Sequence, residues 1–320
     1  MSQRTRQLLL NLLRIGISAI ILSYILSQTG LQRLGEALRN ADPWPYVGAL
    51  MLGLLGVVVR AWRWKVLLDA VNLRVKFTRL MYLYFVGAFY NSFLPTGFGG
   101  DVVRVLEFGP NTDRAVVTGT TIVDRLTGFV MLFMLALAAL PFSTQYLPPE
   151  IIWAVAAAGA GVLLATALLF EGKLLRALTR FLPAPLSLSG EGWLARTFDS
   201  ISRGGRAGLW RALGVSLLFN LVLLTAALLI SQALQLNVSP AALFVFVPIA
   251  TASLLLPISI SGLGVREGLY IALFAQVGVG DAKAIAFSLA YYSLDLFAGI
   301  VGGLLYLFAS AGNLRPEKSE

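Results

Sequence analysis

Apolar segments long enough to cross a lipid bilayer recur along the whole chain of 320 residues. A helix needs about 20 consecutive apolar residues to span the hydrocarbon core. Hydrophobic residues make up 58% of the chain and charged residues only 13%, about half the charged share of a typical soluble domain. We therefore predict an all-α polytopic membrane protein, with residues 1–320 forming a single integral membrane domain.

The absence of cysteine and histidine excludes several kinds of chemistry. Disulfides, thiolate zinc sites, haem held by histidine and Ser–His or Cys–His catalysis all need these residues. We expect no cofactor, no metal site and no enzymatic activity. The net charge of +9 does not indicate nucleic acid as a partner, because most Lys and Arg flank apolar runs. There they orient the protein and contact lipid headgroups. The expected location is the cytoplasmic (inner) membrane.

Two stretches that interrupt the apolar pattern repeat the same order of residues: proline, then Gly-x-Gly, then arginine. The first contains Pro95, Gly97, Gly99, Gly100, Asp101 and Arg104, and the second contains Pro257, Gly262, Gly264, Arg266 and Glu267. An Asp-x-x-x-Gly follows each copy within the next apolar run, from Asp124 to Gly128 and from Asp295 to Gly299. Paired, broken apolar segments in two halves of a chain indicate a transporter's binding site.

The distribution of Lys and Arg predicts the membrane topology. If residues 79–113 crossed the membrane, the basic stretch 171–211 would lie outside, against the preference of Lys and Arg for the cytoplasm. If 79–113 and 240–281 each enter and return, the basic loops fall inside. We predict six full spans, two re-entrant helical hairpins in inverted repeats, and both termini in the cytoplasm. Repeat one covers about 79–170, a cytoplasmic amphipathic segment 171–208, and repeat two about 209–312.

Local signals place the expected helices. Asp42 followed by Pro43 is a good helix opening. The residues from 60 to 65 form an aromatic and basic group typical of the membrane interface, so we expect this helix to end near residue 67. The full spans are predicted at about 7–27, 43–67, 113–140, 150–170, 209–234 and 282–310, with hairpin arms at about 79–95 and 267–277.

Arg104 and Arg266 are the candidates to bind a lipid phosphate, because guanidinium binds phosphate in a fork. Arg104 can also be interpreted as an ordinary cytoplasmic-loop arginine. For Arg266 a functional role is favoured, because burying a charged side chain in the membrane costs free energy. Asp124 and Asp295 are candidates to pair with these arginines, or to form structural ion pairs.

Four further polar residues complete the candidate substrate-binding set, namely Arg125, Glu267, Asn91 and Asp101. Arg125 is a candidate partner of a neighbouring carboxylate. The favoured interpretation of Glu267 is as a dipole partner of its own helix. The prolines and glycines of the two motifs are assigned to the hairpin tips, where glycine permits unusual backbone conformations.

These motifs resemble the lysylphosphatidylglycerol synthase transmembrane domain family, the flippase-like domain of multiple peptide resistance proteins, which also occurs as stand-alone membrane proteins. The matching stretches run from Asn91 to Arg104, Asp124 to Gly128 and Pro257 to Gly268. The resemblance implies a flippase for an anionic or aminoacylated phospholipid, or for a polyprenyl-phosphate-linked lipid. The soluble aminoacyltransferase domain of fused members has no counterpart in these 320 residues, so lipid synthesis is not implied.

A second function class fits the same sequence. A non-transporting scaffold or regulator would hold a lipid-modifying or glycosyltransferase enzyme at the membrane through residues 171–211. A membrane-embedded enzyme is a weaker alternative, since only Asp and Glu remain to act on phosphates. The expected partner is a membrane phospholipid or polyprenyl-linked lipid, with a lipid-modifying enzyme and a second copy of the chain as further candidates.

Overall fold

The computed structural model describes residues 30–93, 99–108, 112–144, 147–171, 205–253 and 262–311, with isolated positions at 23, 25, 27, 195 and 199. All regular structure within these ranges is helical. The predicted first span at 7–27 and the amphipathic segment 171–208 lie almost entirely outside the described residues. The scaffold hypothesis, which relies on residues 171–211, therefore stays a prediction.

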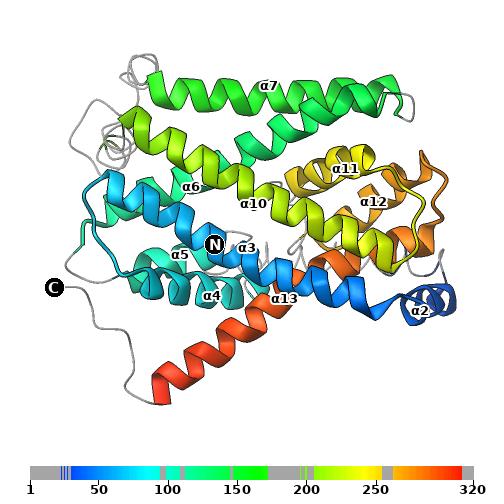
Figure 1. Ribbon diagram of the computed structural model, residues 1–320, viewed down its shortest axis with the longest axis horizontal. Helices are drawn as coiled ribbons and strands as arrows, with labels where there is room; N and C mark the ends of the chain where they lie inside the picture. Colours follow the sequence, from blue (N-terminus) through cyan, green and yellow to red (C-terminus); the bar gives the residue numbers. More distant parts are fainter. Residues whose placement is uncertain are drawn as a thin grey trace, which may run out of the picture.

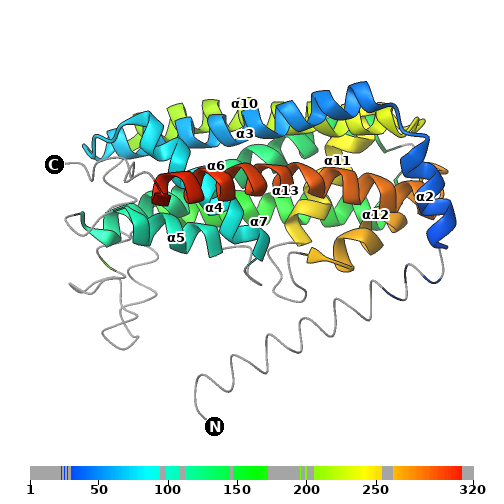
Figure 2. The same ribbon diagram turned by 90° about the horizontal axis from the view of Figure 1, so that it is seen from below.

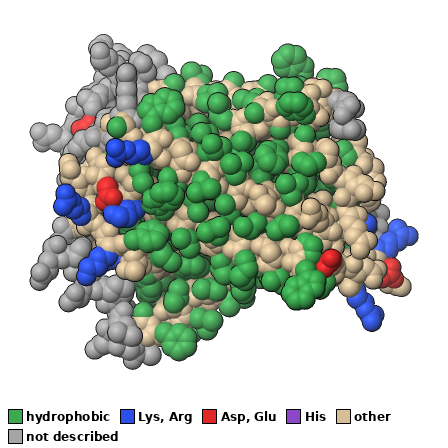
Figure 3. Space-filling view, in the orientation of Figure 1, with side chains coloured by type: hydrophobic (Ala, Val, Ile, Leu, Met, Phe, Trp, Pro, Cys, Tyr) green, Lys and Arg blue, Asp and Glu red, His purple; other side chains and the backbone are tan. Residues whose placement is uncertain are grey.

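Four helices of the described residues are long and apolar enough to cross a membrane. They are α3 (Pro43–Ala70), α6 (Arg114–Ala139, continued by the turn Leu140–Phe142), α10 (Gly205–Ala233) and α13 (Asp281–Ala311). They run along the long axis of the molecule in both ribbon views (Figures 1 and 2). On the face seen in Figure 3, hydrophobic side chains cover the middle and charged side chains gather at the two ends. This confirms the prediction of an all-α polytopic membrane protein.

Two shorter elements lie at the edges of this bundle. Helix α7 (Pro149–Glu171) packs on α6, and its residues Pro149–Leu164 form a shorter apolar helix. Helix α2 (Leu31–Arg39) packs on α13, with Leu34 buried and Leu38 exposed. Helix α7 lies where the span at about 150–170 is predicted.

A short antiparallel hairpin stands between α3 and α6. Its arms are α4 (Phe77–Phe93) and α5 (Gly99–Glu107). At the base, Arg79 Nη2 donates to the carbonyl oxygens of Phe108 (2.5 Å) and Glu107 (3.3 Å). Near the tip, Asn91 Oδ1 accepts a hydrogen bond of 2.6 Å from Gly100 N. A Cβ added to Gly100 would overlap the carbonyl group of Gly87, so only glycine allows the arms to pack this closely.

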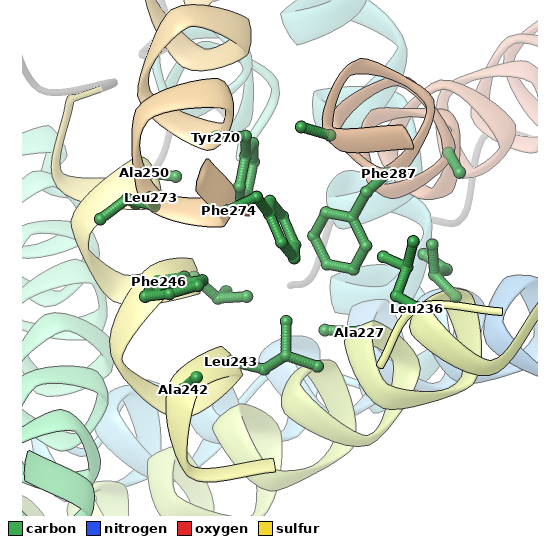
Figure 4. Packing of buried hydrophobic residues seen from close by; sticks show 14 of the residues in the cluster. Ala227, Leu236, Ala242, Leu243, Phe246, Ala250, Tyr270, Leu273, Phe274 and Phe287 are labelled. Carbon is green, nitrogen blue, oxygen red and sulfur yellow. The ribbon is translucent and has the colours of Figure 1, made fainter. Parts of the chain in front are cut away.

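A second hairpin stands before α13. Its arms are α11 (Pro240–Ser253) and α12 (Val265–Ala275). Aromatic rings hold it to α13: the Phe274 ring centroid lies 5.5 Å from that of Phe246 on α11 and 5.0 Å from that of Phe287 on α13 (Figure 4). This hairpin lies at the end of the molecule near α2, while α4 and α5 lie at the opposite end (Figures 1 and 2). Each hairpin is followed by a long helix, α6 or α13.

One prediction about α3 is wrong. Arg63 and Trp64, assigned to an interfacial belt, are buried in the molecule with 3% and 0% of their surfaces exposed. The helix does not end near residue 67 but continues to Ala70, so Arg63 lies about two turns before its end. The Trp64 ring packs against Tyr84 and Phe108 of the first hairpin, at centroid distances of 5.8 and 5.6 Å.

Candidate functional site

A group of charged side chains joins the first hairpin to α3 and α6; three of its members are buried and two are partly exposed. We call it the arginine cluster; it consists of Arg63, Asp101, Arg104, Asp124 and Arg125. Arg63 is seven residues before the end of α3 and Asp124 ten residues after the start of α6. At 1.5 Å per residue, the cluster lies about 10 to 15 Å inside these helices. It is therefore surrounded by the bundle rather than by the connecting loops.

Asp124 is held from two sides. Arg63 Nε donates to its Oδ1 at 2.6 Å, and the Tyr84 hydroxyl donates to its Oδ2. The side chains of Arg63 and Asp124 are only 4% and 2% exposed. Arg63 Nη1 also donates to Ser216 Oγ of α10 at 3.2 Å, so this pair ties three long helices together.

Asp101 bridges two other arginines of the cluster. It accepts from Arg104 Nη2 on its own helix and from Arg125 Nε on α6. The prediction that Arg125 is the partner of a neighbouring carboxylate is confirmed. Because Asp101 lies on α5 and Arg125 on α6, this bridge also attaches the hairpin to the bundle.

One N–H group of Arg104 makes no hydrogen bond to the described residues. Its guanidinium lies 4.0 Å from the Tyr84 ring centroid and 4.9 Å from that of Trp64. Nη1 is 4.0 Å from Asp124 Oδ2 and has no hydrogen-bond partner among the described residues, although Arg104 is only 3% exposed. A buried donor without an acceptor is costly, and more so when it carries charge. The interpretation of Arg104 as an ordinary loop arginine is wrong, because it is a buried helical residue.

The cluster carries excess positive charge. Three arginines share two carboxylates by ion pairing. Arg60 stands beside them, with its guanidinium 5.4 Å from the Phe219 ring centroid and 6.0 Å from that of Tyr84. Its Nε also has no hydrogen-bond partner within the described ranges. An anion is the ligand that this arrangement would stabilise.

The second hairpin holds its arginine differently. Arg266 Nη2 donates to Glu267 Oε1 at 2.7 Å, and Arg266 Nε donates to Ser288 Oγ at 2.9 Å. Glu267 Oε2 accepts from Gly264 N at 2.6 Å, which confirms Glu267 as a partner of its own helix N-terminus. Gly264 has a φ of 86°, in the region that favours glycine. The charge of Arg266 is therefore matched by its neighbour, whereas Arg104 keeps an unused donor.

The other predicted site residues are not brought into the arginine cluster. Asp295 is exposed on α13 and forms no ion pair within the described residues. Asn91 closes the first hairpin. Gly99 is buried at the start of α5, Gly262 has a φ of 75°, and Pro95, Gly97 and Pro257 lie outside the described residues. Among the described residues, no three acidic side chains are grouped as a metal site would require.

Sequence reasoning missed Arg63 as a site residue. The signal was the apolar run from Val66 to Leu68, which carries the helix beyond the predicted end near residue 67 and places Arg63 further inside it. The partner of Arg63 had no such signal, because Asp124 is 61 residues away along the chain.

Fold and site together define a polytopic membrane protein with charged groups buried among its helices. The family model described as "Lysylphosphatidylglycerol synthase TM region" matches residues 11–303, and the chain belongs to this family. It is also similar to two archaeal proteins, each named a UPF0104 membrane protein. The Pyrococcus horikoshii protein is 24% identical over 324 residues, which cover 92% of this chain and 96% of the relative. The Methanothermobacter thermautotrophicus protein is 24% identical over 339 residues, covering 95% and 94%.

Proposed function

We propose that this protein is a lipid flippase that moves an anionic or aminoacylated phospholipid, or a polyprenyl-phosphate-linked lipid, across the cytoplasmic membrane. The observation that carries the proposal is Arg104, a buried arginine on a short hairpin with an N–H group that finds no acceptor in the part of the chain that the structure describes. A lipid phosphate supplies both the acceptor and the negative charge that the cluster lacks. Membership of a lipid-related membrane family supports the same substrate class.

The proposed topology has six full spans, two re-entrant hairpins in inverted repeats, and both termini in the cytoplasm. The four long apolar helices, α7 and the predicted span at 7–27 make up the six. The nine-residue α5 supports re-entry, because it is about 14 Å long and too short to cross. The hairpins extend from opposite ends of the bundle (Figures 1 and 2), as re-entry from opposite membrane faces requires.

The arginine cluster would lower the barrier to moving a headgroup. An unpaired charge in the hydrocarbon core costs several kcal/mol or more. Arg104 offers a phosphate a charged donor about 10 to 15 Å inside the helices, while the acyl chains stay in the surrounding lipid. In this proposal the phosphate leaves the cytoplasmic headgroup layer and is held beside the first hairpin before it passes to the other half.

Reconstitution tests the proposal directly. Liposomes with the purified protein receive phosphatidylglycerol labelled on its acyl chain, and a membrane-impermeant quencher reports how much label changes leaflet. We expect flipping well above that of empty liposomes, and we expect Arg104→Gln to abolish it. Arg33→Gln is the matched control, because Arg33 is exposed on α2. The proposal is wrong if no labelled headgroup, anionic, aminoacylated or polyprenyl-linked, flips faster than in empty liposomes.

A further inference from the structure

We propose that Arg63 is a positioning residue that keeps Arg104 available for the lipid phosphate by holding Asp124 away from it. The inference rests on the proposed function, because it concerns the same anion site. Arg63 does not touch the phosphate in this proposal; it acts through Asp124. The structural basis is a competition between two buried arginines for one carboxylate.

Arg104 stands between two carboxylates and uses only one of them. Its Nη2 is bonded to Asp101, while its Nη1 is 4.0 Å from Asp124 Oδ2, too far for a hydrogen bond. A shift of about 1 Å would bring Asp124 into hydrogen-bond range. Asp124 is thus the carboxylate that would compete with the phosphate for this N–H group.

Arg63 holds Asp124 in its present position. The Nε–Oδ1 distance is 2.6 Å, and the Tyr84 hydroxyl fixes the second carboxylate oxygen. Arg63 is itself fixed by Ser216 at 3.2 Å and by the Phe219 ring, whose centroid is 5.4 Å from the guanidinium carbon. With its donors directed at these partners, Arg63 holds Asp124 beyond hydrogen-bond distance of Arg104 Nη1, at 4.0 Å.

Loss of Arg63 would change the partner of Asp124. A buried carboxylate without a counterion is strongly destabilised, and Arg104 is the other arginine of the cluster paired with it in the structure. Asp124 would then accept a hydrogen bond from Arg104 Nη1, and this N–H group would no longer be available to the phosphate. The ion-paired cluster would fall from three arginines and two carboxylates to two of each, so its surplus charge would also disappear.

Binding measurements on the full-length protein in detergent test this competition. The probe is dioctanoylphosphatidylglycerol, with dioctanoylglycerol as the analogue that lacks phosphate. We expect Arg63→Gln to weaken binding about tenfold, since a hydrogen bond to a charged group contributes roughly that factor. The double variant Arg63→Gln, Asp124→Asn should recover wild-type affinity, because the neutral amide carries no charge with which to capture Arg104. Asp124→Asn alone should bind the probe at least as tightly as the wild type.

A structural role for Arg63 predicts different results. If Arg63 only stabilises the fold, the melting temperature of Arg63→Gln falls in proportion to its loss of binding. Asp124→Asn then also binds the probe more weakly, because the same ion pair is broken. Melting temperature and size-exclusion elution are therefore measured for every variant. If Arg63→Gln does not fold, Asp124→Asn decides: undiminished binding supports the proposal and weaker binding overturns it.

The remaining outcomes are also decisive. Unchanged binding in Arg63→Gln, or no recovery in the double variant, overturns the role of Arg63. Competition by inorganic phosphate as effective as the lipid probe shows that the site takes free phosphate; the role of Arg63 then stands and the lipid substrate does not. If the affinities follow the expected order but reconstituted liposomes show no flipping, transport fails while the positioning role stands. No binding by the wild type overturns both.

Discussion

At the scale of single residues, the two halves of the molecule treat a buried arginine in opposite ways. Arg266 finds a carboxylate on the next residue, Glu267, within 2.7 Å. Arg104 shares Asp101 with Arg125, and no described residue accepts a hydrogen bond from its Nη1. The difference is not visible in the motifs, since both contain an acidic residue within three positions of the arginine. It depends on which neighbours compete for that carboxylate.

The glycine of the first Asp-x-x-x-Gly has a role in this arrangement. A Cβ on Gly128 would lie 2.7 Å from Arg63 Nη1. We therefore expect Gly128→Ala to displace Arg63 from Asp124, with an overpacking cost of about 1–3 kcal/mol and weaker binding of dioctanoylphosphatidylglycerol. Gly161→Ala is the control, because that Cβ meets nothing within 4 Å. Wild-type binding by Gly128→Ala would contradict the positioning role of the Arg63 contact.

At the scale of helices, local chemistry predicts the elements well and their partners poorly. The helix start at Pro43 agrees with the expected one, because proline and a preceding polar cap act within one turn. The end of α3 was placed too early, because aromatic and basic residues are common at membrane interfaces and Arg63 looked like one of them. The ion pair from Arg63 to Asp124 depends on how α3 packs against α6, which no local pattern contains.

The close packing of the first hairpin gives a test at this scale. A Cβ at position 100 would overlap the carbonyl oxygen of Gly87 and lie 2.7 Å from its carbonyl carbon. Gly100→Ala should separate the arms, break the Asn91 hydrogen bond to Gly100 N and lower both the melting temperature and flipping. Gly214→Ala is the matched control, since it lies in α10 with nothing within 4 Å of the added atom. Both variants gain about the same helix propensity, so equal melting temperatures would show that the hairpin does not need this contact.

At the scale of the whole molecule, the two hairpins make the bundle similar at its two ends. Each end presents the open base of one hairpin, and each hairpin leads into a long helix (Figures 1 and 2). A site reached from either membrane face is what a transporter requires. The arginine cluster belongs to one half, so the two ends are alike in their helices but unlike in charge. The proposed flippase would therefore bind a lipid phosphate from the side on which the α4–α5 hairpin opens.

The absence of cysteine makes the orientation of the bundle easy to measure, because a single introduced cysteine reports its own position. Arg74 and Gln276 are exposed, next to the open bases of the first and second hairpins. In intact cells we expect an impermeant maleimide to label Gln276→Cys and not Arg74→Cys, and opened membranes to label both. Labelling of both positions in intact cells would place the two hairpin bases on one face of the membrane. Labelling of Arg74→Cys alone would reverse the orientation and place the base of the first hairpin outside the cytoplasm.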